Sequence, residues 1–122
     1  MKNGLIKLIM LVFVCLSAAC SSLPEVYEVK NQTYPDVVAK KEAKDIIIYT
    51  GAKRGWNFTV VDDNTLQGTL LVRQHMVKVN VPVTRSTYSI LYNDSANLKY
   101  ENGKIHPSYN KWVQTLQNDI NK

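Results

Sequence analysis

The chain has 122 residues, which allows one small domain and excludes a second one. Its formal net charge is +5, from 15 basic and 10 acidic residues. Lys2 and Lys7 account for two of the basic residues, so the chain from residue 20 onward carries 13 basic against 10 acidic residues, a net charge of +3. Much of the apparent basicity therefore belongs to the N-terminal segment.

That segment has the layout of a secretory signal. Lys2 and Lys7 give it a positive start, residues 5–16 are almost entirely apolar, and small residues follow at 17–19. A transmembrane helix needs roughly 20 apolar residues, whereas two serines and Pro24 close this run early. We therefore expect residues 1–19 to be a cleaved signal peptide.

Cys20 follows these small residues directly. The run Ser-Ala-Ala-Cys at 17–20 resembles the lipobox of bacterial lipoproteins, although the leucine of the usual box is one place further back, at Leu16. The resemblance implies that the Cys20 thiol is acylated and begins the mature chain. Alternatively, Cys15 and Cys20 are only small apolar residues of a discarded signal. Cys15 is removed in both cases, so the mature domain has no disulfide.

The residue after Cys20 indicates a compartment. In enteric bacteria an aspartate there tends to retain lipoproteins in the inner membrane, and this chain has Ser21. We therefore expect an outer-membrane lipoprotein that faces the periplasm of a Gram-negative bacterium. Residues 20–33 are expected to be the lipid anchor and a tether reaching roughly 40 Å when extended. Residues 34–122 are expected to form a single domain.

The domain is predicted to begin with a helix. Pro35 and Asp36 suit a first turn, and apolar residues recur on one face from there to about Arg54, where Gly55 ends the helix. The β-branched run at 45–50 has the propensity of a strand instead, but period and start signal favour the helix.

Four alternating segments follow, at 56–61, 65–73, 76–83 and 88–92, and each predicts a half-buried strand. Pro82 places the third at an edge or ends it. The polar run at 93–97 breaks the pattern, and residues 98–100 form a short extended piece. Residues 107–120 carry the clearest amphipathic stripe and predict a final helix. The expected fold is α+β: a two-layer sandwich of a helix, an antiparallel meander of about four strands and a C-terminal helix, with both helices on one face of the sheet.

A frame of short motifs runs through this domain. It consists of Gly-Trp at 55–56, a basic-His hairpin at 73–75, Tyr-Ser-Ile-x-Tyr at 88–92, Ser-x-Asn-Leu at 95–98 and Tyr-Asn-x-Trp at 109–112. The frame resembles a family of small uncharacterised bacterial lipoproteins over roughly residues 43–120. The resemblance supports the localisation and the fold and implies no catalytic or binding residue.

The chain offers little for catalysis. His75 and His106 have no second His or Cys at ligand spacing, and His106 is placed to help cap a helix. The serines lack a nucleophile elbow, and Asp62 and Asp63 lie in a predicted turn. Most aromatic residues are spaced as core residues. We expect no enzyme activity, no metal and no cofactor.

Function is therefore expected on the uncovered face of the sheet, with a loop as a second candidate. The candidate partner face consists of Asn57, Thr59, Leu71, Arg73, Met76, Lys78 and Asn80, and a solvated face without function is the competing interpretation. The candidate loop site is Ser95 and Asn97, whose side chains more simply hydrogen-bond the backbone of a tight loop.

Two hypotheses follow. In the first, the domain is a tethered, non-enzymatic binding or assembly module that recognises an envelope protein or a second copy of itself. In the second, it binds anionic lipid, lipopolysaccharide or glycan by charge. The basic residues available for that are Lys30, Lys40, Lys41, Lys44, Lys53, Arg54, Arg73, Lys78 and Arg85. The small net charge favours the first, and the expected compartment disfavours nucleic acid.

Overall fold

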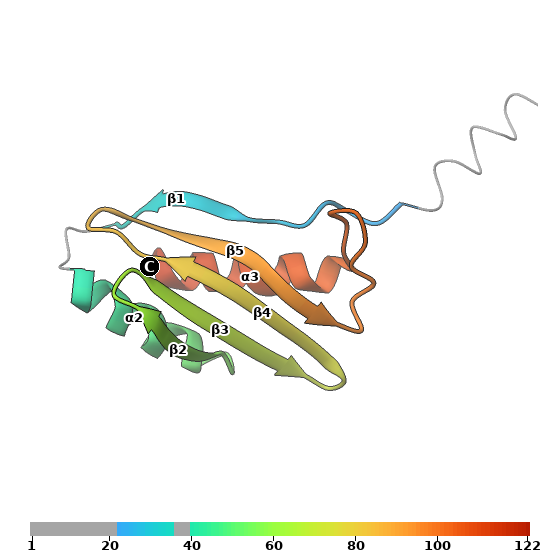
Figure 1. Ribbon diagram of the computed structural model, residues 1–122, viewed down its shortest axis with the longest axis horizontal. Helices are drawn as coiled ribbons and strands as arrows, with labels where there is room; N and C mark the ends of the chain where they lie inside the picture. Colours follow the sequence, from blue (N-terminus) through green and yellow to red (C-terminus); the bar gives the residue numbers. More distant parts are fainter. Residues whose placement is uncertain (1–21, 36–39) are drawn as a thin grey trace, which may run out of the picture.

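The computed structural model describes residues 22–35 and 40–122 and shows an open antiparallel sheet with two helices (Figure 1). In chain order the elements are β1 (Val29–Thr33), α2 (Lys40–Ala52), β2 (Asn57–Asp62), β3 (Thr65–Val72), β4 (His75–Pro82), β5 (Thr87–Ala96) and α3 (Pro107–Ile120). The five strands lie in the order β1-β5-β4-β3-β2, so β2 to β5 form a meander and β1 pairs with its last strand. The predicted α+β class is confirmed.

Alternating burial on β3 and β4 builds the sheet side of the core. β3 buries Leu66 and Leu70, and β4 buries Val77, Val79 and Val81, while the residues between them are half-buried, apart from the buried Gly68 and the exposed Leu71. The register pairs Leu66 with Val81 and Leu70 with Val77, so these side chains share one face.

The number of strands is a correction, because the sequence predicts about four and the structure has five. The additional strand, β1, lies inside the segment 20–33 that the sequence predicts to be anchor and tether. Its local pattern is weak: Val29 is its one buried residue, and Asn31 has a positive φ of 52°. β1 forms because of distant partners, since it pairs with β5 and the Asn31 N–H donates to the Ser89 hydroxyl over 2.9 Å.

β5 is longer than predicted. It continues through the polar run expected to end it and stops at Ala96, because its ladder with β4 resumes after an irregularity opposite Lys78 and Val79. Residues 98–100 do not form a strand. Leu98 is instead a buried core residue between two residues of positive φ, Asn97 and Lys99.

α2 confirms the helical interpretation of the β-branched run, with Ala43, Ile47 and Gly51 buried at four-residue spacing. The helix ends in a Schellman motif: the Gly55 N–H donates to the Ala52 carbonyl, and the Trp56 N–H donates to the Gly51 carbonyl. Gly55 has a φ of 94°, which a side chain would disfavour. Residues 36–39, which include part of the predicted start signal, lie outside the described residues.

α3 begins where the sequence predicts. Pro107 occupies its first turn, and the Nδ1 atom of His106 accepts a hydrogen bond from the Ser108 N–H over 3.1 Å, so His106 is the N-cap. The buried stripe of the helix consists of Tyr109, Val113, Leu116 and Ile120.

The buried residues of both helices and of the strands form a single core cluster. Phe58 on β2 occupies a narrow slot within it. A Cβ atom on Gly51 of α2 would lie 2.3 Å from the Phe58 ring, and one on Gly68 of β3 would lie 2.5 Å from it. Two glycines on different elements therefore make room for one aromatic ring.

Candidate functional site

One set of strand positions forms what we call the open sheet face, defined by Asn57, Thr59, Gln67, Thr69, Leu71, Met76, Lys78 and Asn80. The register places them in three rows: Asn57, Thr69 and Lys78 lie side by side, as do Thr59, Gln67 and Asn80, and Leu71 pairs with Met76. All are half-buried or exposed. The structure thus brings together the predicted face residues of all three strands.

Arg73 is the exception among the predicted face residues. It lies in the turn between β3 and β4, with a positive φ of 55°, and not within a strand. A two-residue turn at 73–74 joins these strands, and alternation along the sequence does not reveal where such a turn begins. Arg73 consequently borders the open sheet face at one end of the hairpin.

The open sheet face is mixed in character. Leu71 is 71% exposed and its cross-strand neighbour Met76 is half-buried, so an apolar pair stands among amides and hydroxyls. Lys78, the one cation among the eight residues of this face, lies opposite Asp94 of β5 in the register. The Asn93 amide donates to Asn80 Oδ1 over 2.9 Å. Charge on this face is therefore locally balanced.

Ser95 and Asn97 do not form one site. The Ser95 hydroxyl is 2.8 Å from the Tyr92 hydroxyl. The Asn97 amide instead donates to the Gln74 carbonyl over 2.6 Å, and the Asn97 carbonyl lies 2.9 Å from Nδ1 of His75. Asn97 thus fastens the β3–β4 turn to the end of β5.

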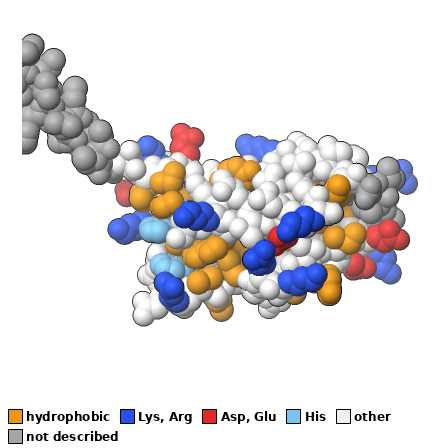
Figure 2. All heavy atoms as spheres, turned by 180° about the vertical axis from the view of Figure 1, so that it is seen from behind, with side chains coloured by type: hydrophobic (Ala, Val, Ile, Leu, Met, Phe, Trp, Pro, Cys, Tyr) orange, Lys and Arg blue, Asp and Glu red, His pale blue; other side chains and the backbone are white. Residues whose placement is uncertain are grey.

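Basic side chains are spread over the molecule and several have partners. Figure 2 shows Lys and Arg side chains scattered over the visible face and not gathered in one patch. Arg54 Nε lies 2.9 Å from Asp119 Oδ2, an interaction that lowers the pKa of the Asp119 carboxyl. Lys40 donates to the Asn64 side chain, and Lys53 lies over the ring of Tyr49.

Sequence reasoning missed a set of contacts made by amide side chains on α3. Asn110 Oδ1 accepts from the Tyr27 N–H over 2.8 Å, and Asn110 Nδ2 donates to the Glu25 carbonyl over 3.0 Å. Gln117 accepts from the Tyr27 hydroxyl and donates to the Gln32 side chain. Amides on a helix that also carries a clear apolar stripe are the only sequence signal of these contacts.

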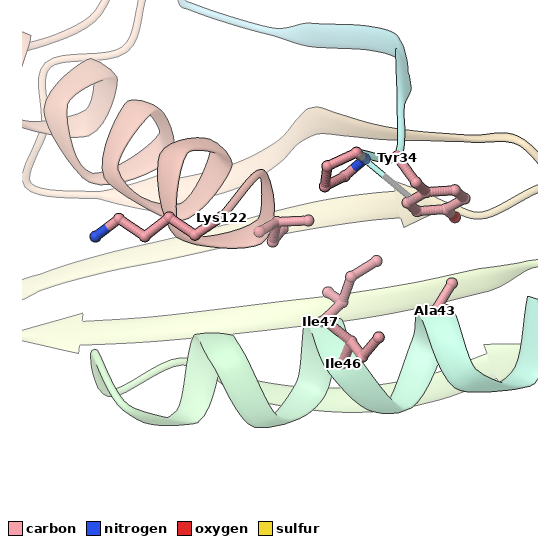
Figure 3. Close-up of a pocket in the computed structure, with 7 residues that line it drawn as sticks. Tyr34, Ala43, Ile46, Ile47 and Lys122 are labelled. Carbon is pink, nitrogen blue, oxygen red and sulfur yellow. The ribbon is translucent and has the colours of Figure 1, made fainter. Parts of the chain in front are cut away.

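A cavity of about 170 Å³ lies between α2 and the end of α3 (Figure 3). Its lining is mostly apolar, with Ala43, Ile46 and Ile47 from α2 and Lys122 at the C-terminus. Ligand pockets generally have volumes of about 300 Å³ or more and contain convergent polar groups. The size and lining of this cavity are those of a packing gap beside a helix pair.

Tyr109 and Tyr88 are both buried, and burial raises the pKa of each hydroxyl. Their hydrogen bonding differs. The Tyr88 hydroxyl donates to Asn121 Oδ1 over 2.6 Å, whereas within the described residues the Tyr109 hydroxyl has no partner. A buried polar group without a partner costs about 1–3 kcal/mol, so the two rings contribute differently to stability.

We expect Tyr109→Phe to leave the free energy of unfolding unchanged or to raise it by up to about 1 kcal/mol, because the substitution removes an unpaired buried hydroxyl. Tyr88→Phe is the matched control and should lower stability by about 1 kcal/mol through its lost hydrogen bond. Urea unfolding followed by tryptophan fluorescence measures both. Equal losses in the two variants would show that Tyr109 has a partner after all.

Comparisons with known proteins identify no relative, since no protein-family model, no curated protein and no solved structure matches the chain. Within residues 22–35 and 40–122, no helix combines the length and apolarity needed to cross a bilayer. The same residues contain no cluster of three or more His, Cys, Asp or Glu side chains suited to a metal ion.

Proposed function

We propose that the protein is an outer-membrane lipoprotein, anchored through acylated Cys20 and facing the periplasm, that acts as a non-enzymatic binding or assembly module. The open sheet face is the proposed docking surface, and another protein of the cell envelope is the proposed partner. Cys20 lies outside the described residues, so the anchor is inferred from the layout of residues 1–20.

A two-layer arrangement underlies this proposal. The buried residues of α2 and α3 belong to the same core cluster as Leu66, Val77 and Val79. The positions between those strand residues form the open sheet face. We therefore infer that both helices cover one face of the sheet and leave the other for a partner.

The observation that carries the proposal is the apolar pair at the end of the open sheet face. Leu71 is the most exposed large hydrophobic residue among those described, and Met76 is directly opposite it on β4. Exposed apolar side chains rimmed by polar ones are typical of partner surfaces, and methionine adapts to irregular ones. Thr69 and Lys78 of the neighbouring row supply hydrogen-bonding groups at the rim.

The side chains that most often perform chemistry have structural roles here. His106 caps α3, His75 lies against the Asn97 carbonyl, and the Ser89 hydroxyl accepts from β1. These contacts support a binding role over an enzymatic one. Because Arg54, Lys40 and Lys53 also have partners within the domain, a charge-driven binder of lipopolysaccharide or glycan is less well supported.

Crosslinking in intact envelopes, followed by purification of the full-length protein, tests the proposal. We expect the wild type to capture a specific envelope protein, and we expect Leu71→Glu and Lys78→Glu to reduce that capture at least about tenfold each, since an interface residue that costs more than about 1.4 kcal/mol has that effect. Capture should persist at high salt, because apolar contact is not screened.

Matched variants elsewhere on the surface control for charge and exposure. Tyr49→Glu changes an exposed apolar residue on α2, and Lys111→Glu reverses an exposed cation on α3. Both should leave capture unchanged. Capture that survives the two open-face substitutions would refute the docking surface, and capture that disappears at high salt would support the charge-driven alternative. Recovery of a second copy of this chain alone would show self-association instead.

A further inference from the structure

Residues 24–33, which the sequence predicts to be part of a tether, are attached to the domain along their length. The Val26 N–H donates to the Gly103 carbonyl over 2.8 Å, and the Ile105 N–H donates to the Pro24 carbonyl over 3.0 Å. Glu25 and Lys104 form an isolated bridge between the same two stretches of chain. The chain is therefore bound to the domain from Pro24 onward.

The Asn110 side chain of α3 makes further hydrogen bonds to the same stretch of chain. Its amide satisfies the Tyr27 N–H and the Glu25 carbonyl, as a neighbouring strand would. Gln117, two turns further along the helix, holds the Tyr27 hydroxyl and the Gln32 side chain. We call Asn110 and Gln117 the amide clamp.

The attachment limits how far the domain can stand from its anchor. Pro24, the first residue hydrogen-bonded to the domain, comes four positions after Cys20, and four extended residues reach about 14 Å. The sequence alone suggested a tether of roughly 40 Å for the same segment. A lipid on Cys20 would therefore hold this end of the domain close to the membrane surface.

We propose that one end of the domain, the anchor end, rests on the phospholipid headgroups of the membrane that holds Cys20. The anchor end consists of Leu23, Lys99, Tyr100, Glu101 and Lys104. Ser22 and Leu23 border the same shallow hollow as Lys99, Glu101 and Lys104. This inference rests on the lipid anchor of the proposed function.

The chemistry of the anchor end suits a headgroup layer. Tyr100 is 44% exposed and its ring stacks on Tyr92 at 4.1 Å, and tyrosine is enriched at membrane interfaces. Lys99 and Lys104 are exposed and can meet phosphates, but Glu25 and Glu101 are exposed beside them. Because charge is balanced here, the contact follows from the short attachment and does not require anionic lipid.

The two ends of the molecule can be compared directly. In Figure 1 the anchor end lies at the right, and the β2–β3 turn lies at the left, so the strands run between them. β5 alone has ten residues, a span of about 33 Å. A probe at the β2–β3 turn therefore serves as an internal reference for one at the anchor end.

A quenching experiment with the lipidated protein in phosphatidylcholine vesicles tests this inference. Glu101→Cys and Asp63→Cys are each labelled with a fluorophore, and lipids carrying a headgroup nitroxide quench any label close to the surface. We expect at least about threefold stronger quenching at residue 101 than at residue 63, given a separation of about 33 Å. High salt should not change the ratio. Equal quenching in vesicle-bound protein would overturn the anchor-end inference alone.

The amide clamp provides the second arm. Asn110→Ala combined with Gln117→Ala should lower the quenching at residue 101 toward the value at residue 63, because losing the amide contacts weakens the attachment of residues 24–32 and lengthens the tether. Asn118→Ala combined with Gln114→Ala alters exposed amides on the same helix and should have no effect. Unchanged quenching in the clamp variant would overturn the proposed cause. A protein that does not bind vesicles at all would overturn the lipid anchor itself, and this inference with it.

Discussion

Gly51→Ala is expected to destabilise the protein by about 2 kcal/mol, which is the opposite of the usual effect of this substitution in a helix. Alanine is normally better than glycine inside a helix by about 1 kcal/mol. At Gly51 the new Cβ would lie 2.3 Å from the Phe58 ring, and the ring cannot move away because it lies close to Gly68 on its other side. Overpacking of this kind costs about 1–3 kcal/mol.

Two variants isolate the cause. Ala52→Gly, at the exposed last residue of α2, measures the intrinsic preference at this helix end and should cost up to about 1 kcal/mol. In a Phe58→Leu background the clash is relieved, so Gly51→Ala should there become neutral or stabilising. Urea unfolding followed by tryptophan fluorescence gives the free energy of unfolding of the wild type and of each variant. If Gly51→Ala stabilises the wild type, the close packing of Phe58 on Gly51 is refuted.

The role of Gly51 beside the Phe58 ring could not be predicted from the sequence. Gly51 follows a β-branched run and precedes Gly55, so the pair suggests a helix end. Only Gly55 has that role, with its positive φ and Schellman hydrogen bonds. Gly51 lies within α2 and is needed because Phe58 packs against it. A glycine required for backbone conformation is recognisable locally, whereas one required for close approach depends on a residue from another element.

The same distinction explains the rest of the fold. Period and capping residues predicted α2 and α3, because apolar stripes and N-caps depend on neighbours three or four residues away. The strands β2 to β5 were predicted from alternation for the same reason. β1 was missed because its stability comes from β5 and from Ser89, which are more than fifty residues away in sequence.

The open sheet face could be predicted as far as alternation determines it. Asn57, Thr69 and Lys78 are paired across their strands, and the alternation of side chains along each strand predicts that they point to the same face. Arg73 was assigned to the face because alternation continues formally into the turn, where the backbone changes direction. The amide clamp was beyond prediction, since an asparagine on a helix gives no indication of which distant backbone groups it will bind.

The sequence predicts a membrane-associated position, and Cys20→Ala is the substitution expected to have the largest effect in the cell. The acylated wild type should sediment almost entirely with membranes, because more than one acyl chain makes attachment lasting. The variant lacks the thiol that we propose to carry the lipid and should be almost absent from the membrane fraction. Fractionation of cells expressing each form, followed by quantitative immunoblotting, measures the change.

The other cysteine is the matched control for this prediction. Cys15 lies within the apolar run, five residues before Cys20, and Cys15→Ala should leave the protein with the membranes. A Cys20→Ala variant that stays bound to membranes would contradict lipid anchoring and would indicate that residues 5–19 are retained as a hydrophobic anchor. Intact mass of the purified protein then separates the two cases, because cleavage before Cys20 removes the lysines at positions 2 and 7 and acylation adds the mass of the lipid.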